Sequence, residues 1–272
     1  MKKFKLRQFE IPYNFDKNLI YGLEILNVNF DVIKFIYVAP FMEDYIGVYR
    51  ENTNGKNKLT REEYEDHIKF LAEKMPGKLQ LLLQRPKDLM SEEKLKWYID
   101  LGFTNFSCGS INQAKIIKNI DQNLTTVSSI TMHIDDGKLL TNLEYGKYFN
   151  EFCLDFSYCH NIQAIKMLPP YYNYMLLINS LCNCHCDGTH HWFHNPLDGE
   201  MHCPGKLGDI GFNDSCLVRP MDLDYFDPYI STYKLQDRSW STADILRDIV
   251  LYTTEFSIYP GIDYNEGAYE TF

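Results

Sequence analysis

Short apolar runs alternate along the chain with longer segments in which apolar residues recur at helical spacing. The short runs are rich in β-branched and aromatic residues, as strands are. The longer segments have the apolar stripe of an amphipathic helix. The predicted strands are 3–12, 31–40, 77–86, 103–110, 124–134, 149–157, 172–179 and 229–238, and the predicted helices are 15–26, 60–75, 91–102, 111–120, 159–168 and 241–256.

This order of elements predicts the fold class. Strands separated by helices of this length pair in parallel through right-handed crossovers. Eight such strands in 272 residues indicate an α/β protein with a (β/α)8 barrel of the TIM type, and a doubly wound open sheet is the alternative. No internal repeat, low-complexity tract or linker interrupts the pattern, so we expect a single domain over residues 1–272.

Local signals fix the ends of two helices. Thr60 is followed three residues later by Glu63, which is the pattern of a capping box at a helix start. Ser91 precedes two glutamates, and Gly102 follows the next apolar stripe. Ser91 is therefore the expected N-cap of the third helix and Gly102 its expected C-terminal stop.

One long stretch, about 180–228, shows neither helical nor strand periodicity and directly follows the seventh predicted strand. Barrel enzymes build their sites from the loops at the carboxyl ends of the strands. Loops this long without regular structure are usually functional. The sequence therefore predicts an enlarged functional loop after strand seven.

Cysteine and histidine are concentrated in this loop. Four cysteines follow the pattern Cys182-x3-Cys186-x16-Cys203-x12-Cys216, and four thiolates suit tetrahedral zinc or an iron–sulfur cluster. Structural zinc usually uses two tight cysteine pairs, whereas only the first pair is tight here. A catalytic zinc held by three histidines is a further alternative. The segment contains other potential ligands, so the ligand set stays open; they are Cys184, His185, His190, His191 and His194.

Composition and charge exclude some classes of protein. A net charge of −10 argues against a general nucleic-acid binder, whose affinity rests on a cationic surface. No run approaches the ~20 apolar residues of a membrane helix, and the N-terminus lacks the apolar segment of a signal peptide. We therefore expect a cytoplasmic protein, in which disulfides are rare, and interpret Cys108, Cys153 and Cys159 as buried core residues.

Several motifs resemble the U32 peptidase-like family. The segment from Asn179 to Cys186 is similar to its Asn-x-x-Cys-x-x-x-Cys motif. Arg219-Pro-Met-Asp-Leu resembles its Arg-Pro-Glu-Asp-Leu stretch, and Lys234-Leu-Gln-Asp-Arg238 resembles its Phe-Lys-Leu-x-x-Arg strand. The first two predicted strands are also similar, so the resemblance spans most of the chain. Asp187 replaces the usual proline and Met221 an acidic residue, which indicates a divergent member.

The resemblance implies a barrel and several functions. Some members are described as collagenase-like peptidases. A branch that includes the paired proteins of anaerobic ubiquinone synthesis holds a 4Fe–4S cluster through four cysteines. Members of that branch support hydroxylation without molecular oxygen, with prephenate implied as hydroxyl donor. For this chain it implies a cluster-dependent, oxygen-independent hydroxylase with Cys182, Cys186, Cys203 and Cys216 as ligands. A U32-type peptidase or peptide-maturation enzyme and a non-catalytic, cluster-bearing subunit of a heterodimer are the alternatives.

The resemblance and the residue spacing together suggest candidate site residues. Asn179 and His191 are expected beside the cluster as catalytic residues. Lys234 and Arg238 are four residues apart on a predicted strand, so they share one face. A buried cation needs a partner, and a small anionic substrate would supply it. A structural ion pair with an aspartate of this chain is the alternative.

Arg219 completes the predicted substrate-binding set, with packing at the barrel rim as its alternative role. Asn14 and Arg50 follow the first two strands and are weaker pocket candidates. The chain contains neither the G-x-S-x-G nor the H-E-x-x-H motif. A peptidase function therefore has no motif of its own in this sequence.

Overall fold

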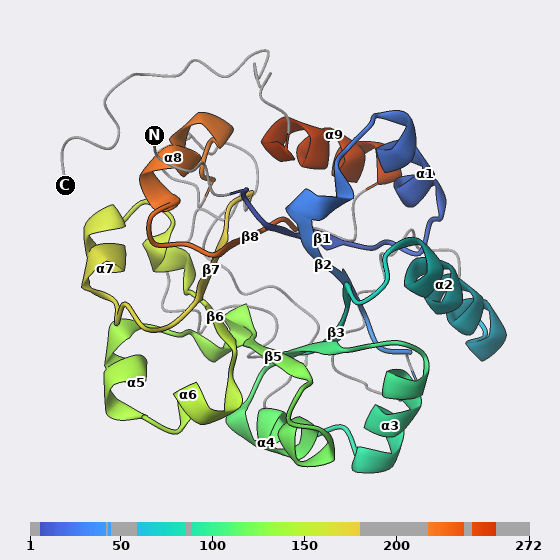
Figure 1. Cartoon of the computed structure of the whole chain (residues 1–272), viewed down its shortest axis with the longest axis horizontal. Coiled ribbons are helices and arrows are strands. Elements are labelled where there is room, and N and C mark those ends of the chain that lie inside the picture. The colour runs from blue at the N-terminus through green and yellow to red at the C-terminus, as the bar shows by residue number, and fades with distance from the viewer. Residues whose placement is uncertain are drawn as a thin grey trace, which may run out of the picture.

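The computed structural model describes residues 6–41, 43–44, 59–84, 89–179, 217–236 and 241–253. These residues form a closed barrel of parallel strands in sequence order, with β8 paired to β1 (Figure 1). The predicted barrel is confirmed, and the open-sheet alternative is wrong. The strands are β1 (Phe9–Pro12), β2 (Ile33–Val38), β3 (Leu79–Leu83), β4 (Asn105–Cys108), β5 (Thr125–Ser128), β6 (Glu151–Cys153), β7 (Tyr174–Leu177) and β8 (Thr232–Lys234).

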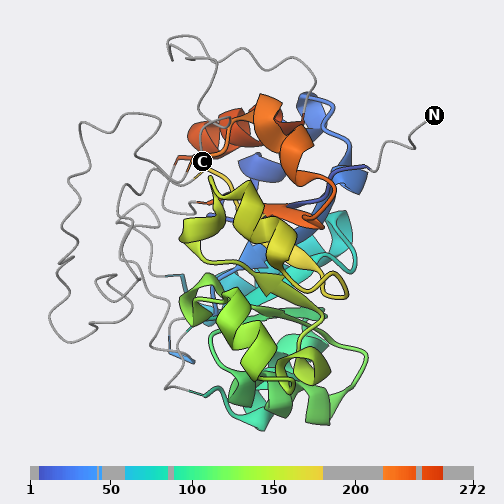
Figure 2. The ribbon, with the colours of Figure 1, turned by 90° about the vertical axis from the view of Figure 1, so that its left-hand side faces the viewer.

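Helices surround this barrel, as the face-on view and the view turned by 90° both show (Figures 1 and 2). None of the described helices is long and apolar enough to cross a bilayer. The α-helices are α1 (Asn18–Ile25), α2 (Arg61–Lys74), α3 (Glu92–Asp100), α4 (Ile111–Ile120), α5 (Asp136–Thr141), α6 (Tyr145–Tyr148), α7 (Ile162–Met167), α8 (Leu223–Phe226) and α9 (Thr242–Thr253). Short 3₁₀-helices are η1 (Phe30–Val32), η2 (Ile130–Met132), η3 (Phe156–Tyr158) and η5 (Pro220–Asp222).

The predicted helix ends are confirmed. The hydroxyl of Thr60 accepts a hydrogen bond from the N–H of Glu63, and the Glu63 carboxylate accepts one from the N–H of Thr60. Ser91 caps α3 in the same way through the N–H of Lys94. Gly102 follows α3 with a φ of 106°, a conformation that glycine adopts without a steric penalty.

Several predicted boundaries need correction. The run 149–157 is a strand only over Glu151–Cys153, and η3 begins at Phe156. The run 124–134 is a strand only as far as Ser128, because the chain then turns through η2. The last part of the predicted irregular stretch 180–228 has regular structure. Leu217 forms a β-bridge with Asn179, and η5 and α8 follow before β8. The short α8 thus fills the place between β7 and β8 where a barrel carries a helix.

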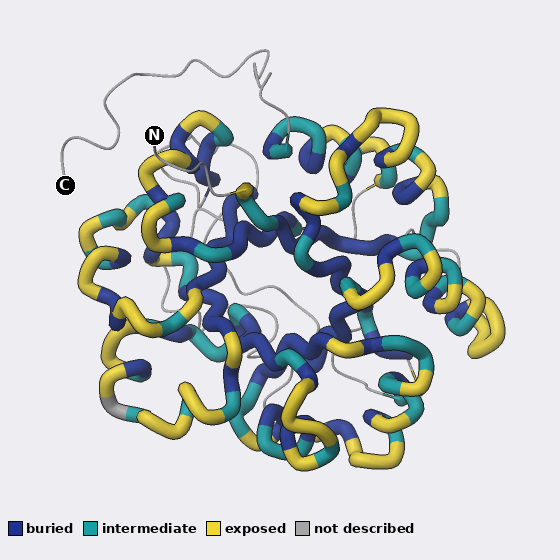
Figure 3. Tube along the Cα trace, in the orientation of Figure 1, coloured by how far each residue is buried: buried dark blue, intermediate teal, exposed yellow. Residues whose placement is uncertain are grey.

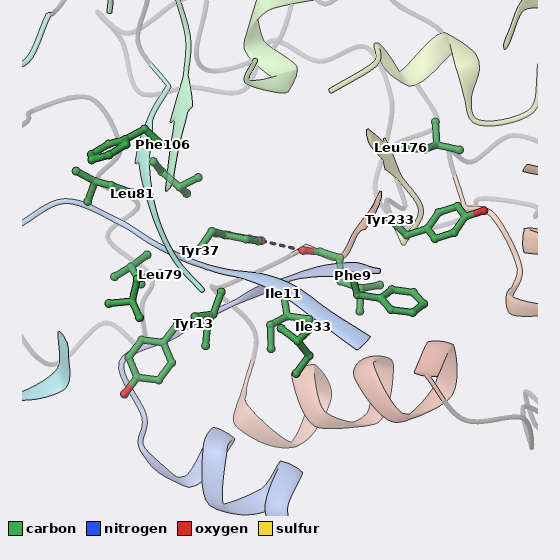
Figure 4. Packing of buried hydrophobic residues seen from close by; sticks show 14 of the residues in the cluster. Phe9, Ile11, Tyr13, Ile33, Tyr37, Leu79, Leu81, Phe106, Leu176 and Tyr233 are labelled. Carbon is green, nitrogen blue, oxygen red and sulfur yellow. Dashed lines mark hydrogen bonds between the residues drawn. The ribbon is translucent and has the colours of Figure 1, made fainter. Parts of the chain in front are cut away.

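The main hydrophobic core lies between the strands and the helices. Figure 3 shows the buried ring of strands and the exposed outer sides of the helices. Ile11 and Ile33 belong to this core and point from β1 and β2 toward α1 and α9 (Figure 4). Burial of one such side chain contributes about 1.5–3 kcal/mol. Cys108 and Cys159 lie in the same core, which confirms the interpretation of these thiols.

A second and smaller cluster contains residues from facing strands of the barrel, namely Phe35, Val127, Cys153 and Met175. Because side chains alternate along a strand, these residues point toward the barrel axis. Barrel interiors are usually filled by bulky branched residues. Here the interior also carries charge, because buried Glu151 accepts hydrogen bonds from Lys34 (2.7 Å) and Thr232 (2.6 Å).

Gln80 on β3 is another polar residue of the strands, and it is fully buried. Among the described residues, neither its Nε2 nor its Oε1 has a hydrogen-bond partner. An unsatisfied buried amide costs about 1–3 kcal/mol. The Gln80→Leu change should therefore raise the free energy of unfolding by roughly that amount, measured by urea denaturation.

Gln113 offers a matched control. It is also fully buried, but its Oε1 accepts a hydrogen bond from the N–H of Met90 at 2.7 Å. The Gln113→Leu change should lower stability, because it leaves that N–H unpaired. Equal losses for both variants would contradict this account of Gln80.

Candidate functional site at the mouth of the barrel

The carboxyl ends of the strands are where a barrel presents its chemistry. Several polar side chains lie directly beyond these ends in the described residues. They are Asn14 after β1, Gln84 after β3, His133 after β5, Asp155 after β6, Asn179 after β7 and Gln236 after β8.

Asn179 is buried and joins three elements through its side chain. Its Oδ1 accepts a hydrogen bond from the N–H of Gln236 at 2.7 Å, and its Nδ2 donates to the Gln236 carbonyl. The same Nδ2 donates to Asp248 of α9 at 3.0 Å. Burial raises the pKa of Asp248, and the hydrogen bond from Asn179 opposes that rise. Asn179 therefore fixes the ends of β7 and β8 against α9.

The chain returns to the barrel beside Asn179. Leu217 lies opposite Asn179 in an antiparallel bridge, and the N–H of Val218 donates to the carbonyl of Ile178 at 2.8 Å. The Tyr252 hydroxyl of α9 donates to the Val218 carbonyl at 2.7 Å. We call Ile178, Asn179, Leu217 and Val218 the clip. It holds together the two points where residues 180–216 leave and re-enter the barrel.

The predicted metal ligands Cys182, Cys186, Cys203 and Cys216 lie outside the described residues, as do His191, Arg238 and the weaker candidate Arg50. The surplus ligands Cys184, His185, His190 and His194 also lie there. Within the described ranges, no group of three or more His, Cys, Asp or Glu side chains could hold a metal ion. Along the chain, the clip is the described part of the barrel nearest to the predicted metal ligands Cys182 and Cys216.

Lys234 ends β8 inside the barrel, with its side chain only 7% exposed. It forms an ion pair with the fully buried Glu10 of β1, its partner in the strand register. Its Nζ also lies 4.3 Å from the ring centroid of Tyr37. Burial raises the pKa of Glu10, and the charge of Lys234 opposes that rise. The partner that this buried cation requires is therefore a carboxylate of the chain itself.

Arg219 is also buried and paired. Its guanidinium binds Asp222 of η5, with an Nη2–Oδ1 distance of 2.9 Å. The pair holds the start of η5 next to the clip, as expected for the packing role at the rim. Substrate binding by Arg219 stays a prediction. Asn14 donates from Nδ2 to the Thr242 hydroxyl at 3.0 Å and so connects β1 to α9.

His133 and Asp155 form a pair that the sequence analysis missed. His133 Nδ1 lies 2.7 Å from Asp155 Oδ2, and each side chain is 14% exposed. The two residues follow neighbouring strands, β5 and β6. His133 was overlooked because it lay inside the predicted fifth strand. Ser129 could have indicated the turn, because the serine hydroxyl commonly caps a turn.

Comparison with protein-family models and with curated proteins finds no match. Among solved structures, the U32 peptidase Mk0906 is similar with a TM-score of 0.54 and 10% sequence identity, over 87% of this chain and 96% of that one. A xylose isomerase domain containing protein from Salmonella typhimurium has a TM-score of 0.46 and 12% identity, over 92% and 97% of the two chains. At 10% identity, the similarity to Mk0906 shows the barrel fold alone.

The buried pair of Glu10 and Lys234 makes a testable prediction. Removal of one partner leaves an uncompensated buried charge, which costs about 3–5 kcal/mol. Glu10→Leu and Lys234→Met should each lower the free energy of unfolding by about that amount. The double variant should lose less than either single variant.

Denaturation of all three proteins tests this prediction. Lys96→Met is the control, because Lys96 and Glu92 form a pair in which both side chains are more than half exposed, and such pairs contribute little. Additive losses in the double variant would contradict a direct interaction between Glu10 and Lys234.

Proposed function

We propose that this chain is an iron–sulfur protein of the U32 peptidase-like family, in which Cys182, Cys186, Cys203 and Cys216 hold a 4Fe–4S cluster. The observation that carries the proposal is the clip. Cys182 follows Asn179 by three residues, and Cys216 directly precedes Leu217. The first and last proposed ligands are therefore close along the chain to two residues that face each other across a β-bridge.

The position of the clip supports this assignment. Residues opposite each other in an antiparallel bridge have Cα atoms about 4.5–5.5 Å apart, so the bridge removes much of the entropy cost of closing the loop. The clip is buried and is hydrogen-bonded to β8 and α9. A rigid base at the carboxyl ends of the strands is where a barrel builds its site.

The chemistry of the other cysteines also supports it. A cysteine binds a metal ion in its thiolate form. Burial raises the pKa of Cys153 to about 12 and raises that of Cys108 as well. These thiols therefore stay protonated in the core and do not compete for iron. Cys159 is also buried in the core. The other five cysteines all lie in residues 180–216, so we assign the thiolate ligands to that segment.

We propose oxygen-independent hydroxylation, or a related modification, as the activity. A bound cluster supplies one-electron chemistry at the mouth. Asn179 positions the base of the loop, and His191 is the proposed polar residue beside the substrate. Arg238 is the proposed cation for a small anionic substrate, because Lys234 is already paired with Glu10. Arg219 and Lys234, which are paired with Asp222 and Glu10, have a supporting role in the proposed substrate-binding set. We propose a cytoplasmic location for this chemistry.

A second candidate function is a U32-type peptidase, which the similarity in fold to the U32 peptidase Mk0906 favours. A third is a cluster-bearing subunit without activity of its own. Zinc in the four-cysteine site is the alternative metal. Iron analysis separates the cluster from zinc, and anion binding separates the proposed hydroxylase from the peptidase.

Anaerobically purified protein should contain about four iron and four sulfide per chain. Cys182→Ser, Cys186→Ser, Cys203→Ser and Cys216→Ser should each remove most of the iron, because each deletes a ligand. Cys184→Ala is the matched control in the same segment and should keep the iron. Stoichiometric zinc in place of iron, or loss of iron only in the control, would refute the assignment.

Arg238 should bind the carboxylate of the substrate through two parallel hydrogen bonds. Lysine keeps the charge but loses this geometry. Arg238→Lys should therefore weaken prephenate binding by roughly tenfold or more, measured by anaerobic calorimetry, while the iron content is unchanged. Arg219→Lys tests the same role for Arg219. Wild-type protein that binds no prephenate yet cleaves peptides after iron removal would favour the peptidase.

A further inference from the structure

The pair of His133 and Asp155 is built on backbone pairing between two neighbouring connections. Ile134 and Leu154 form a parallel β-bridge directly beside it. The N–H of Asp155 donates to the Ile134 carbonyl at 3.2 Å. The imidazole and the carboxylate thus lie on adjacent, hydrogen-bonded segments beyond the carboxyl ends of β5 and β6.

His133 has a left-handed backbone conformation, with φ 47° and ψ 59°. Glycine adopts this conformation without a steric penalty, whereas a residue with a Cβ pays for it. Lys138 stabilises the turn, because its Nζ donates to the carbonyls of Met132 (2.8 Å) and His133. The position thus carries an imidazole where the backbone favours glycine. Residues strained in this way cluster at functional sites.

The carboxylate of Asp155 is held in a fixed orientation. Its Oδ1 accepts a hydrogen bond from the N–H of Ser157 at 3.0 Å, and its Oδ2 faces His133 Nδ1. Burial acts to raise the pKa of Asp155, but the hydrogen bonds from His133 and Ser157 outweigh it and lower the pKa. An ionised carboxylate at Nδ1 favours the Nδ1–H tautomer, in which Nε2 accepts a proton.

Other charged and polar groups surround the pair without taking this role. Asp135 caps α5 through the N–H of Lys138 at 2.7 Å. The N–H of Asp136 donates to the Tyr158 hydroxyl at 3.0 Å. Lys138 binds backbone carbonyls. In the described structure, Asp155 is therefore the carboxylate bonded to the imidazole of His133.

We propose that His133 and Asp155 form a general acid–base pair at the mouth of the barrel. Nε2 of His133 takes a proton from a hydroxyl or a water at the substrate: the O–H bond breaks and an N–H bond forms. The Asp155 carboxylate stabilises the resulting imidazolium, which returns the proton in the reverse step. The identity of the substrate rests on the proposed function, but the state of the pair does not depend on the cluster.

The tautomer of His133 tests the pair directly. Nitrogen NMR of ¹⁵N-histidine-labelled protein at pH 8, assigned with His133→Gly, should show the proton on Nδ1. In Asp155→Asn the side-chain amide can donate to Nδ1, so the proton should move to Nε2. A wild-type imidazole with its proton on Nε2 would overturn the proposal.

The chemical reactivity of His133 separates an acid–base role from a structural hydrogen bond. Diethyl pyrocarbonate, which modifies an unprotonated imidazole nitrogen, should label His133 in folded wild-type protein, with labelling at least about tenfold slower in Asp155→Asn. Labelling only after unfolding, or equal labelling rates in the wild type and in Asp155→Asn, would overturn the proposal.

The iron assay separates this proposal from the proposed function. His133→Gly should keep the iron content of the wild type, since the pair follows β5 and β6, whereas the clip follows β7. Wild-type protein without iron but with an Nδ1–H imidazole would refute the cluster and leave the pair supported. Loss of iron in His133→Gly would overturn the pair as an independent site.

Discussion

Closure of the barrel depends on β8, a strand of three residues that pairs with β7 on one side and β1 on the other. Its register aligns Lys234 with Glu10, and the resulting ion pair lies in the interior. A shift of one residue would turn Lys234 into the outer hydrophobic layer, because side chains alternate along a strand. The ion pair therefore favours one register of a very short strand.

The same strand determines what the mouth of the barrel can hold. The backbone of Gln236 follows β8 and binds both amide atoms of Asn179. Asn179 belongs to the clip, and the Tyr252 hydroxyl of α9 donates to the clip carbonyls. Barrel closure, the end of β7 and the entry and exit of residues 180–216 thus form one continuous hydrogen-bonded unit. The strained turn at His133 and its partner Asp155 follow β5 and β6, and β6 pairs directly with β7.

Periodicity was enough to predict the barrel, because strand-like runs alternate with helical patterns along most of the chain. It predicted no helix between β5 and β6, where the structure has α5 and α6. Periodicity failed where long-range contacts or the backbone conformation of a single residue determine the structure. The sequence indicated that Lys234 needs a partner, but Glu10 lies 224 positions away and is identified only by the strand register. The turn at His133 was hidden because its neighbours Ile130, Met132 and Ile134 are apolar enough to extend the strand pattern. The pairing of Asn179 with Asp248 is likewise a product of tertiary structure.

The central claim is that a 4Fe–4S cluster is bound by the cysteines of the loop that begins and ends at the clip. Native mass spectrometry of anaerobically purified protein tests it most directly, since it reads metal identity and stoichiometry from one intact chain. The account predicts a mass increase of one 4Fe–4S unit over the apoprotein, and none in Cys182→Ser. A single bound zinc, or an apoprotein mass for fresh anaerobic wild-type protein, would contradict it.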